Sequence, residues 1–155
     1  MQDSTIISKS WKGILVAKLD SLGKVGWARS VGGTWFNHGH GIAVDGKNNC
    51  YVTGTFEGTA TYGKKELVAR AKDLFVARLD TTGAVQWYAA TSGQDTSERF
   101  FNSGEEIVAD DQGAHVLGRI THTNRVVTSA GDSLVTSRGL HDVVLFKIVS
   151  NLVAP

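Results

Sequence analysis

Short apolar runs, each closed by a turn that contains aspartate and glycine, recur along the chain. The run Ile14–Leu19 precedes Asp20–Gly23, and the run Leu74–Leu79 precedes Asp80–Gly83. Aspartate at the first position and glycine at the fourth are typical of a type I turn. Short runs rich in Val, Leu and Ile that are bounded by such turns predict β-hairpins.

The strand before each of these turns is apolar on both of its faces. Successive residues of a strand point to opposite sides, so Leu15 and Leu19 share one side while Ile14 and Val16 share the other. A strand of a sheet with one solvated face would instead alternate apolar and polar residues. The pattern therefore predicts a sheet that is covered on both faces.

Much of this pattern is repeated. Ile14–Trp27 reads ILVAKLDSLGKVGW, Leu74–Trp87 reads LFVARLDTTGAVQW, and Val143–Val149 is a shortened copy, VVLFKIV. A second hairpin, Gly41–Gly54, returns at Ile107–Gly118. Similarity at a long and constant spacing is the signature of a repeat architecture.

The repeat divides what we expect to be a single domain, because 155 residues are enough to bury one core. Within residues 1–155 we expect a half-unit at 5–35, a full unit at 36–91 and a partial unit at 92–155. Glycine occurs 18 times and proline once, between short apolar runs, which predicts an all-β chain. A helix at Glu66–Lys72 is an alternative, but the aligned Ser133–Gly139 is a poor helix former, so we expect an extra strand pair.

Three segments of the middle unit resemble the bacterial β-propeller repeat called SBBP: Gly41–Asp45 (GIAVD), Tyr51–Gly54 (YVTG) and Asp73–Asp80 (DLFVARLD), followed by Trp87. The resemblance covers essentially the whole chain. It implies blades of four antiparallel strands with GIAVD innermost, and about two and a half blades in this chain. In the last unit Val149 replaces the aspartate, and no closing Gly or Trp follows.

Two and a half blades do not close a ring, so the end blades are expected to expose apolar faces to water. Either the chain is a fragment of a longer propeller, or several chains complete a ring or stack into a filament. The residues expected in intermolecular strands are Thr5, Ile6, Ile7, Val143, Leu145 and Ile148. The resemblance implies an extracellular or cell-surface location. Because residues 1–10 lack a signal-peptide pattern, an export signal would either lie outside this sequence or not exist.

Composition and motifs narrow the classes of function. A net charge of +1 argues against a nucleic-acid binder with a basic surface, and no apolar run approaches the roughly 18 residues of a membrane span. The single Cys50 excludes an internal disulfide and a multi-cysteine zinc site. The sequence contains no nucleophile elbow, phosphate loop or His-Glu-x-x-His motif. We therefore predict no catalytic residue, no cofactor and no metal.

A few polar and aromatic residues are candidates for ligand or partner contacts. His38 and His40 would share a strand face and could chelate a metal, but the aligned Ser103 and Glu105 do not repeat them, which favours a solvated loop. Glu105 and Glu106 could line a channel mouth, although neighbours on a strand point to opposite faces. The candidate contacts are Trp35, Asn37, His38, His40, Asn102, Glu105 and Glu106.

The aspartates Asp20, Asp45, Asp80 and Asp110 recur at strand ends. Carboxylates in a repeat could bind calcium, but their place before Gly and Asn favours capping of turns.

Three functions follow as hypotheses. The first is a non-enzymatic extracellular or cell-surface structural and interaction module that assembles by blade or strand complementation into an oligomer or filament. The second is a ligand-binding propeller fragment of a larger secreted protein, in which the loops Gly33–His40 and Ser92–Gly104 hold carbohydrate or protein. The third, an enzyme with its site near His38, His40, Glu105 and Glu106, is the weakest because no catalytic motif supports it.

Overall fold

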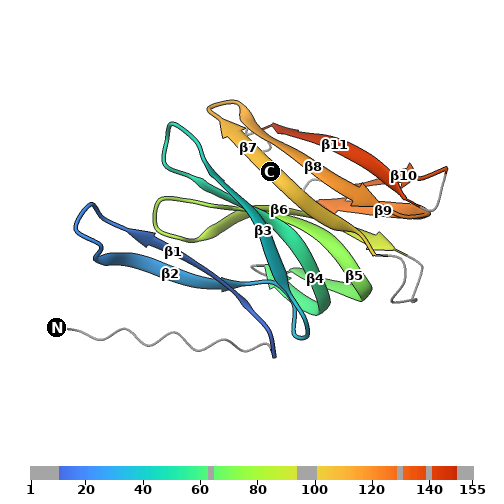
Figure 1. Ribbon diagram of the computed structural model, residues 1–155, viewed down its shortest axis with the longest axis horizontal. Coiled ribbons are helices and arrows are strands. Elements are labelled where there is room, and N and C mark those ends of the chain that lie inside the picture. The colour runs from blue at the N-terminus through green and yellow to red at the C-terminus, as the bar shows by residue number, and fades with distance from the viewer. Residues whose placement is uncertain (1–10, 63–64, 94–100, 129–130, 139–140, 150–155) are drawn as a thin grey trace.

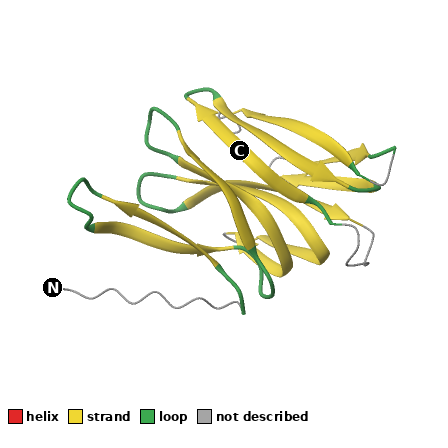
Figure 2. Cartoon of the chain, in the orientation of Figure 1, coloured by secondary structure: helices red, strands yellow, loops and turns green. Residues whose placement is uncertain are grey.

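Every regular element of this protein is a β-strand in the residues that the structure describes, which are 11–62, 65–93, 101–128, 131–138 and 141–149 (Figures 1 and 2). The structure is a computed structural model of the chain. Its strands are β1 (Ile14–Leu19), β2 (Val25–Val31), β3 (His38–Val44), β4 (Cys50–Tyr62), β5 (Lys65–Leu79), β6 (Val85–Gly93), β7 (Ser103–Asp110), β8 (Gly113–Ile120), β9 (Thr123–Thr128), β10 (Gly131–Thr136) and β11 (Asp142–Val149). The prediction of an all-β chain is confirmed.

The strands form three antiparallel sheets, with the orders β1-β2, β10-β9-β6-β5-β4-β3 and β11-β8-β7. We call these sheets layer 1, layer 2 and layer 3. In Figure 1 the β1–β2 hairpin lies on one side of the β3–β6 strands, and β7, β8 and β11 lie on the other. Layer 2 is therefore the middle layer.

Side chains of aspartate hold the hairpin turns. Asp20 Oδ1 accepts hydrogen bonds from the backbone N–H groups two and four residues further on, both at 2.9 Å. Asp80 and Asp45 form the same pattern, and Asp110 accepts from the second and third N–H groups. The prediction that these aspartates cap turns is confirmed.

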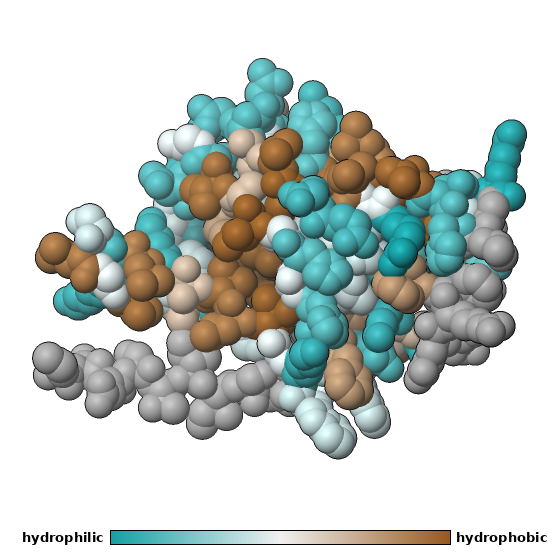
Figure 3. All heavy atoms as spheres, viewed as in Figure 1, coloured by the Kyte–Doolittle hydropathy of each residue, from teal (hydrophilic) through white to brown (hydrophobic). Residues whose placement is uncertain are grey.

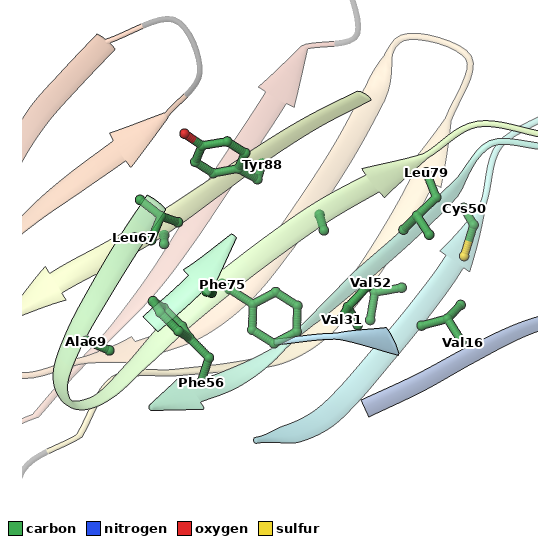
Figure 4. Close-up of a cluster of buried hydrophobic side chains, with 13 residues drawn as sticks. Val16, Val31, Cys50, Val52, Phe56, Leu67, Ala69, Phe75, Leu79 and Tyr88 are labelled. Atoms are coloured by element: carbon green, nitrogen blue, oxygen red, sulfur yellow. The ribbon is translucent and has the colours of Figure 1, made fainter. Parts of the chain in front are cut away.

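One apolar core lies between layer 1 and layer 2 (Figure 4). Val16 of β1 and Val31 of β2 are buried there, together with Val52, Phe56 and Phe75 of layer 2. The rings of Phe56 and Phe75 meet edge to face, with centroids 6.3 Å apart. A ring pair in this geometry adds about 1 kcal/mol to what its burial contributes.

A second core lies between layer 2 and layer 3. Leu74 and Val76 of β5 are buried there with Val116 of β8 and Ile148 of β11. The alternate residue Phe75 belongs to the first core. Because β5 contributes to a core on each side, the prediction of a sheet covered on both faces is confirmed for layer 2. For the Ile14–Leu19 strand it is wrong within the described residues, because Leu15 and Leu19 are exposed.

The region after each second hairpin forms strands, as predicted, and residues 66–72 are not a helix. In the middle unit β4 and β5 simply continue past a bulge near Gly58, which has φ +79°. At the equivalent place in the last unit His122 has φ +54°, and the chain turns into the separate β9–β10 hairpin. This hairpin pairs with β6 of layer 2, an arrangement that the repeat did not predict.

Candidate functional site

Strands β1, β5 and β11 occupy equivalent positions in the three layers. Comparing their matching residues shows which side chains are buried in the middle layer but exposed in an outer layer. In β5, Phe75 and Leu79 face layer 1 and are fully buried. Their counterparts in β1 are Leu15 and Leu19, whose side chains are 61% and 54% exposed. We call this outward surface of Leu15, Ala17 and Leu19 the N-side face.

The opposite end of the stack shows the same contrast. Leu74 and Val76 of β5 face layer 3 and are buried, whereas their counterparts in β11, Val143 and Leu145, are 77% and 67% exposed. Exposed Val108 and Leu117 lie on the matching side of β7 and β8. We call the surface of Val108, Leu117, Val143 and Leu145 the C-side face.

The inner strand of layer 2 extends the apolar surface beside layer 1. Ile42 and Val44 of β3 lie opposite Val52 and Cys50 of β4. Val52 and Cys50 are buried under layer 1, but Ile42 and Val44 are exposed because layer 1 contains only two described strands. Figure 3 shows apolar side chains gathered over the β1–β2 hairpin and over the strands beside it. Contiguous exposed apolar surface of this kind marks interaction sites in soluble proteins.

Each outer layer also has unpaired strand edges within the described part of the chain, and those of β1 and β11 adjoin the exposed faces. β1 pairs only with β2, and β11 pairs only with β8. Edge strands present backbone N–H and C=O groups that can pair with another strand. Faces and edges together make each end of the stack a surface suited to a further β-layer.

A tryptophan lies at each of the two interfaces between layers, but only one of the two indole N–H groups has a hydrogen-bond partner in the part of the chain that the structure describes. The indole Nε1 of Trp27 donates to the carbonyl oxygen of Thr81, 3.0 Å away in the β5–β6 turn. Its counterpart Trp87 is buried between layers 2 and 3, and its Nε1 has no hydrogen-bond partner among the described residues. A small apolar cavity of about 140 Å³ adjoins Trp87, between β5, β6, β9 and β11.

The predicted histidine and glutamate candidates lie on the inner strands β3 and β7. The β3–β4 and β7–β8 ladders skip His40 and Glu105, so each is the extra residue of a bulge. His40 Nδ1 lies 2.9 Å from the Gly104 carbonyl oxygen and 3.7 Å from Glu105 Oε2. The structure thus joins His40 and Glu105 across two layers, while Glu106 is exposed in the ladder opposite Leu117.

His38 does not complete a metal site with its neighbour. The rings of His38 and His40 are 6.2 Å apart, and the described residues contain no group of three or more His, Cys, Asp or Glu that could hold an ion. Lys12 Nζ lies 3.5 Å from His38 Nε2. Burial, and then the nearby Lys12 charge, hold the pKa of His38 below its ordinary value.

The two predicted asparagines organise loops. Asn37 is buried, and its Nδ2 donates to the carbonyl oxygens of Lys12 at 2.7 Å and Gly33 at 2.8 Å. Asn102, its counterpart, donates to buried Asp73 at 2.8 Å. Both side chains therefore bind the protein itself rather than face solvent.

Trp35 is the exposed aromatic candidate. It lines a cavity of about 380 Å³ together with Phe36, Arg70, Lys72 and Phe101. Aromatic rings beside cationic side chains suit a ligand with an apolar face and polar or anionic groups. This cavity lies apart from the N-side and C-side faces.

The predicted intermolecular strand residues have different positions. Val143 and Leu145 form part of the C-side face, whereas Ile148 packs against layer 2. Thr5, Ile6 and Ile7 lie outside the described residues. Sequence reasoning did not find the unpaired N–H of Trp87, because it results from packing between layers.

The described residues contain no helix long and apolar enough to cross a membrane. No family model matches the chain, and no curated protein matches it either. A function must therefore be inferred from the chain's own surfaces.

Proposed function

We propose that this chain is a non-catalytic structural and interaction module of the SBBP β-propeller type, which self-assembles at the cell surface or outside the cell. Each layer is then one complete or partial blade, and the N-side and C-side faces are where further copies bind. One observation carries the proposal. Apolar positions that are buried in layer 2 recur exposed in β1 and β11.

The partner is a second copy because each face is a repeat of a surface that is already matched within the chain. The N-side face carries Leu15 and Leu19 where layer 2 carries Phe75 and Leu79, which are buried against layer 1. The C-side face likewise repeats the surface with which layer 2 meets layer 3. Two unlike faces that fit each other form a head-to-tail contact, which gives a ring or a filament.

Burial of these exposed apolar residues contributes a substantial share of the free energy of association. Covering one exposed leucine stabilises a contact by about 1.5–3 kcal/mol, so a few such residues offset part of the entropy lost on association. Charge substitution at a single central residue should therefore be enough to disrupt the contact.

The test compares Leu15→Lys with Val68→Lys, a control at an equally exposed apolar residue of β5 that is outside both faces. Size-exclusion chromatography with light scattering should show that the unmodified chain and the control associate, and that Leu15→Lys stays monomeric. Equal association of both variants would show that the N-side face is not a contact between copies.

A second candidate is the binding of a carbohydrate or another ligand in the cavity beside Trp35. The observation that favours it is the exposed indole in a cavity lined by Phe36 and Phe101. A glycan array followed by calorimetry should then find a ligand that Trp35→Ala loses while assembly persists. An array without hits, or binding that survives Trp35→Ala, would count against this candidate.

A further inference from the structure

We propose that two copies share one layer, in which the β1–β2 hairpin of a second copy takes the place of β11 beside β8. The composite layer would have the order β7-β8 from one copy and β1-β2 from the other. This inference rests on the proposed self-assembly and specifies how the copies meet.

The contact between layers 1 and 2 provides the pattern. Trp27 at the end of layer 1 donates to the Thr81 carbonyl oxygen and lies against Gly83 in the β5–β6 turn. A Cβ at Gly83 would come within 2.7 Å of the indole ring, and Gly83 has φ +80°. Only glycine suits this position without strain, because its backbone is left-handed and a ring covers it.

The two halves of this contact occur again, separated from each other. Trp87 has a buried Nε1 without an acceptor among the described residues. The β1–β2 turn has the same aspartate cap, and Gly23 has φ +78° with no atom within 4 Å of its would-be Cβ. The indole of Trp87 in one copy and the β1–β2 turn of a second copy can therefore form the same contact that Trp27 forms with the β5–β6 turn.

The sequence that follows β11 lacks the residues of such a turn. The repeat places Val149 where Asp80 caps its turn, and Leu152 where Gly83 lies under the tryptophan. A leucine side chain cannot take the place of Gly83 there, because even a Cβ would collide with the ring. Among the described residues, β11 completes the strand beside β8, and none of them places a turn over Trp87 and the cavity beside it.

The exchange also covers the exposed apolar positions of the N-side face. Leu15 and Leu19 would then pack where Ile148 now packs against layer 2. Val25, the counterpart of the partly buried Val85, would enter the cavity beside Trp87. Each copy would contribute one complete layer of its own and half of each shared layer.

The inner strands would become matched as well. Ile42 and Val44 of the second copy face the side on which its layer 1 has no inner strands among the described residues. Val108 and Leu117 of the first copy are exposed on the facing side of β7 and β8. Within one chain β3 and β7 already meet in this way, since Gly41 lies against Ile107.

The repeat fixes the register of the new pairing. In layer 2, Arg78 lies opposite Tyr51. Lys18 and His115 hold the matching positions in β1 and β8, so the exchange places Lys18 of one copy opposite His115 of the other. In the single chain His115 lies opposite Lys147.

The experiment uses the full chain with Cys50→Ala, which copies the alanine at the matching position Ala114. Lys18→Cys combined with His115→Cys should yield disulfide-linked oligomers after mild oxidation. The matched control is a separate variant, Lys147→Cys with His115→Cys, which should form its disulfide within one chain. Oligomers that associate without forming the Lys18→Cys/His115→Cys disulfide would overturn the exchange.

A second measurement tests whether β11 must leave. Ile148→Ala weakens the hold of β11 on layer 2 and lies outside both exposed faces. If β11 is displaced on assembly, this variant should associate at least about tenfold more tightly than the unmodified chain. Unchanged or weaker association would overturn the exchange and leave self-assembly through the two faces intact. If the unmodified chain does not associate at all, the proposed function of self-assembly is wrong.

Discussion

The Trp27 indole N–H donates to the carbonyl oxygen of Thr81 at 3.0 Å, and this bond ties the β1–β2 hairpin to a turn of the next layer. The two residues are far apart in sequence. The same ring covers Gly83, so the hydrogen bond and the glycine act as one contact.

Substitutions at Gly83 and Gly23 should distinguish the free energy of the contact between layers from the free energy of backbone strain in the turn. We expect Gly83→Val to lower the free energy of unfolding by more than Gly23→Val does, because both turns have positive φ but only Gly83 lies under a ring. The strain in each turn should cost about 1–3 kcal/mol, and the collision with Trp27 adds to it. Urea unfolding of monomers at low concentration measures both. Equal losses would show that Trp27 does not lock the layers.

The buried polar link between layers 2 and 3 gives a second prediction. Asn102 donates to Asp73 at 2.8 Å and accepts from the backbone N–H of Thr121 at 2.9 Å. Asn102→Ala should cost about 1–3 kcal/mol of unfolding free energy, because buried polar groups lose partners. Thermal and urea unfolding measure the loss. A change below a few tenths of a kcal/mol would contradict the importance of the link.

Asp45 should make stability depend on acidity. Burial alone would raise its pKa, but hydrogen bonds from the side chain and backbone of Asn49 and from the backbone of Lys47 lower the pKa below the ordinary value of 3.8. A carboxylate whose pKa is lower in the folded state stabilises the fold above its unfolded pKa. That contribution is lost as pH falls below about 4 and through the folded pKa. Asp45→Asn should flatten this part of the stability profile, and an unchanged acid slope would contradict it.

Cys50 should be unreactive until the protein unfolds. Burial raises the pKa of its thiol, and the thiolate is the species that alkylating reagents attack. We expect iodoacetamide to label the chain in urea and to leave the native protein unlabelled at neutral pH over the same interval. Rapid native labelling would show that the core between layers 1 and 2 opens readily.

The strands, turns and two-sided burial of layer 2 follow from local sequence. Alternation along β5 assigns Phe75 to one core and Leu74 to the other without knowledge of the neighbours. The four turn aspartates are equally readable because each bonds within its own turn. Patterns that repeat at short range can be predicted because their partners are close in sequence.

Features that depend on which layer lies next could not be predicted. The β9–β10 hairpin pairs with β6 because the chain turns at His122, a residue whose φ +54° carries no strong sequence signal. The unpaired N–H of Trp87 likewise results from the packing of layer 2 against layer 3, which the sequence around Trp87 does not determine.

Sedimentation velocity of the unmodified chain across a range of concentrations tests the central claim most directly. Apolar surface exposed at both ends of the stack predicts masses that rise in multiples of 16.6 kDa as the concentration increases. A single 16.6 kDa species up to high micromolar concentration, with a cooperative thermal transition, would contradict the account.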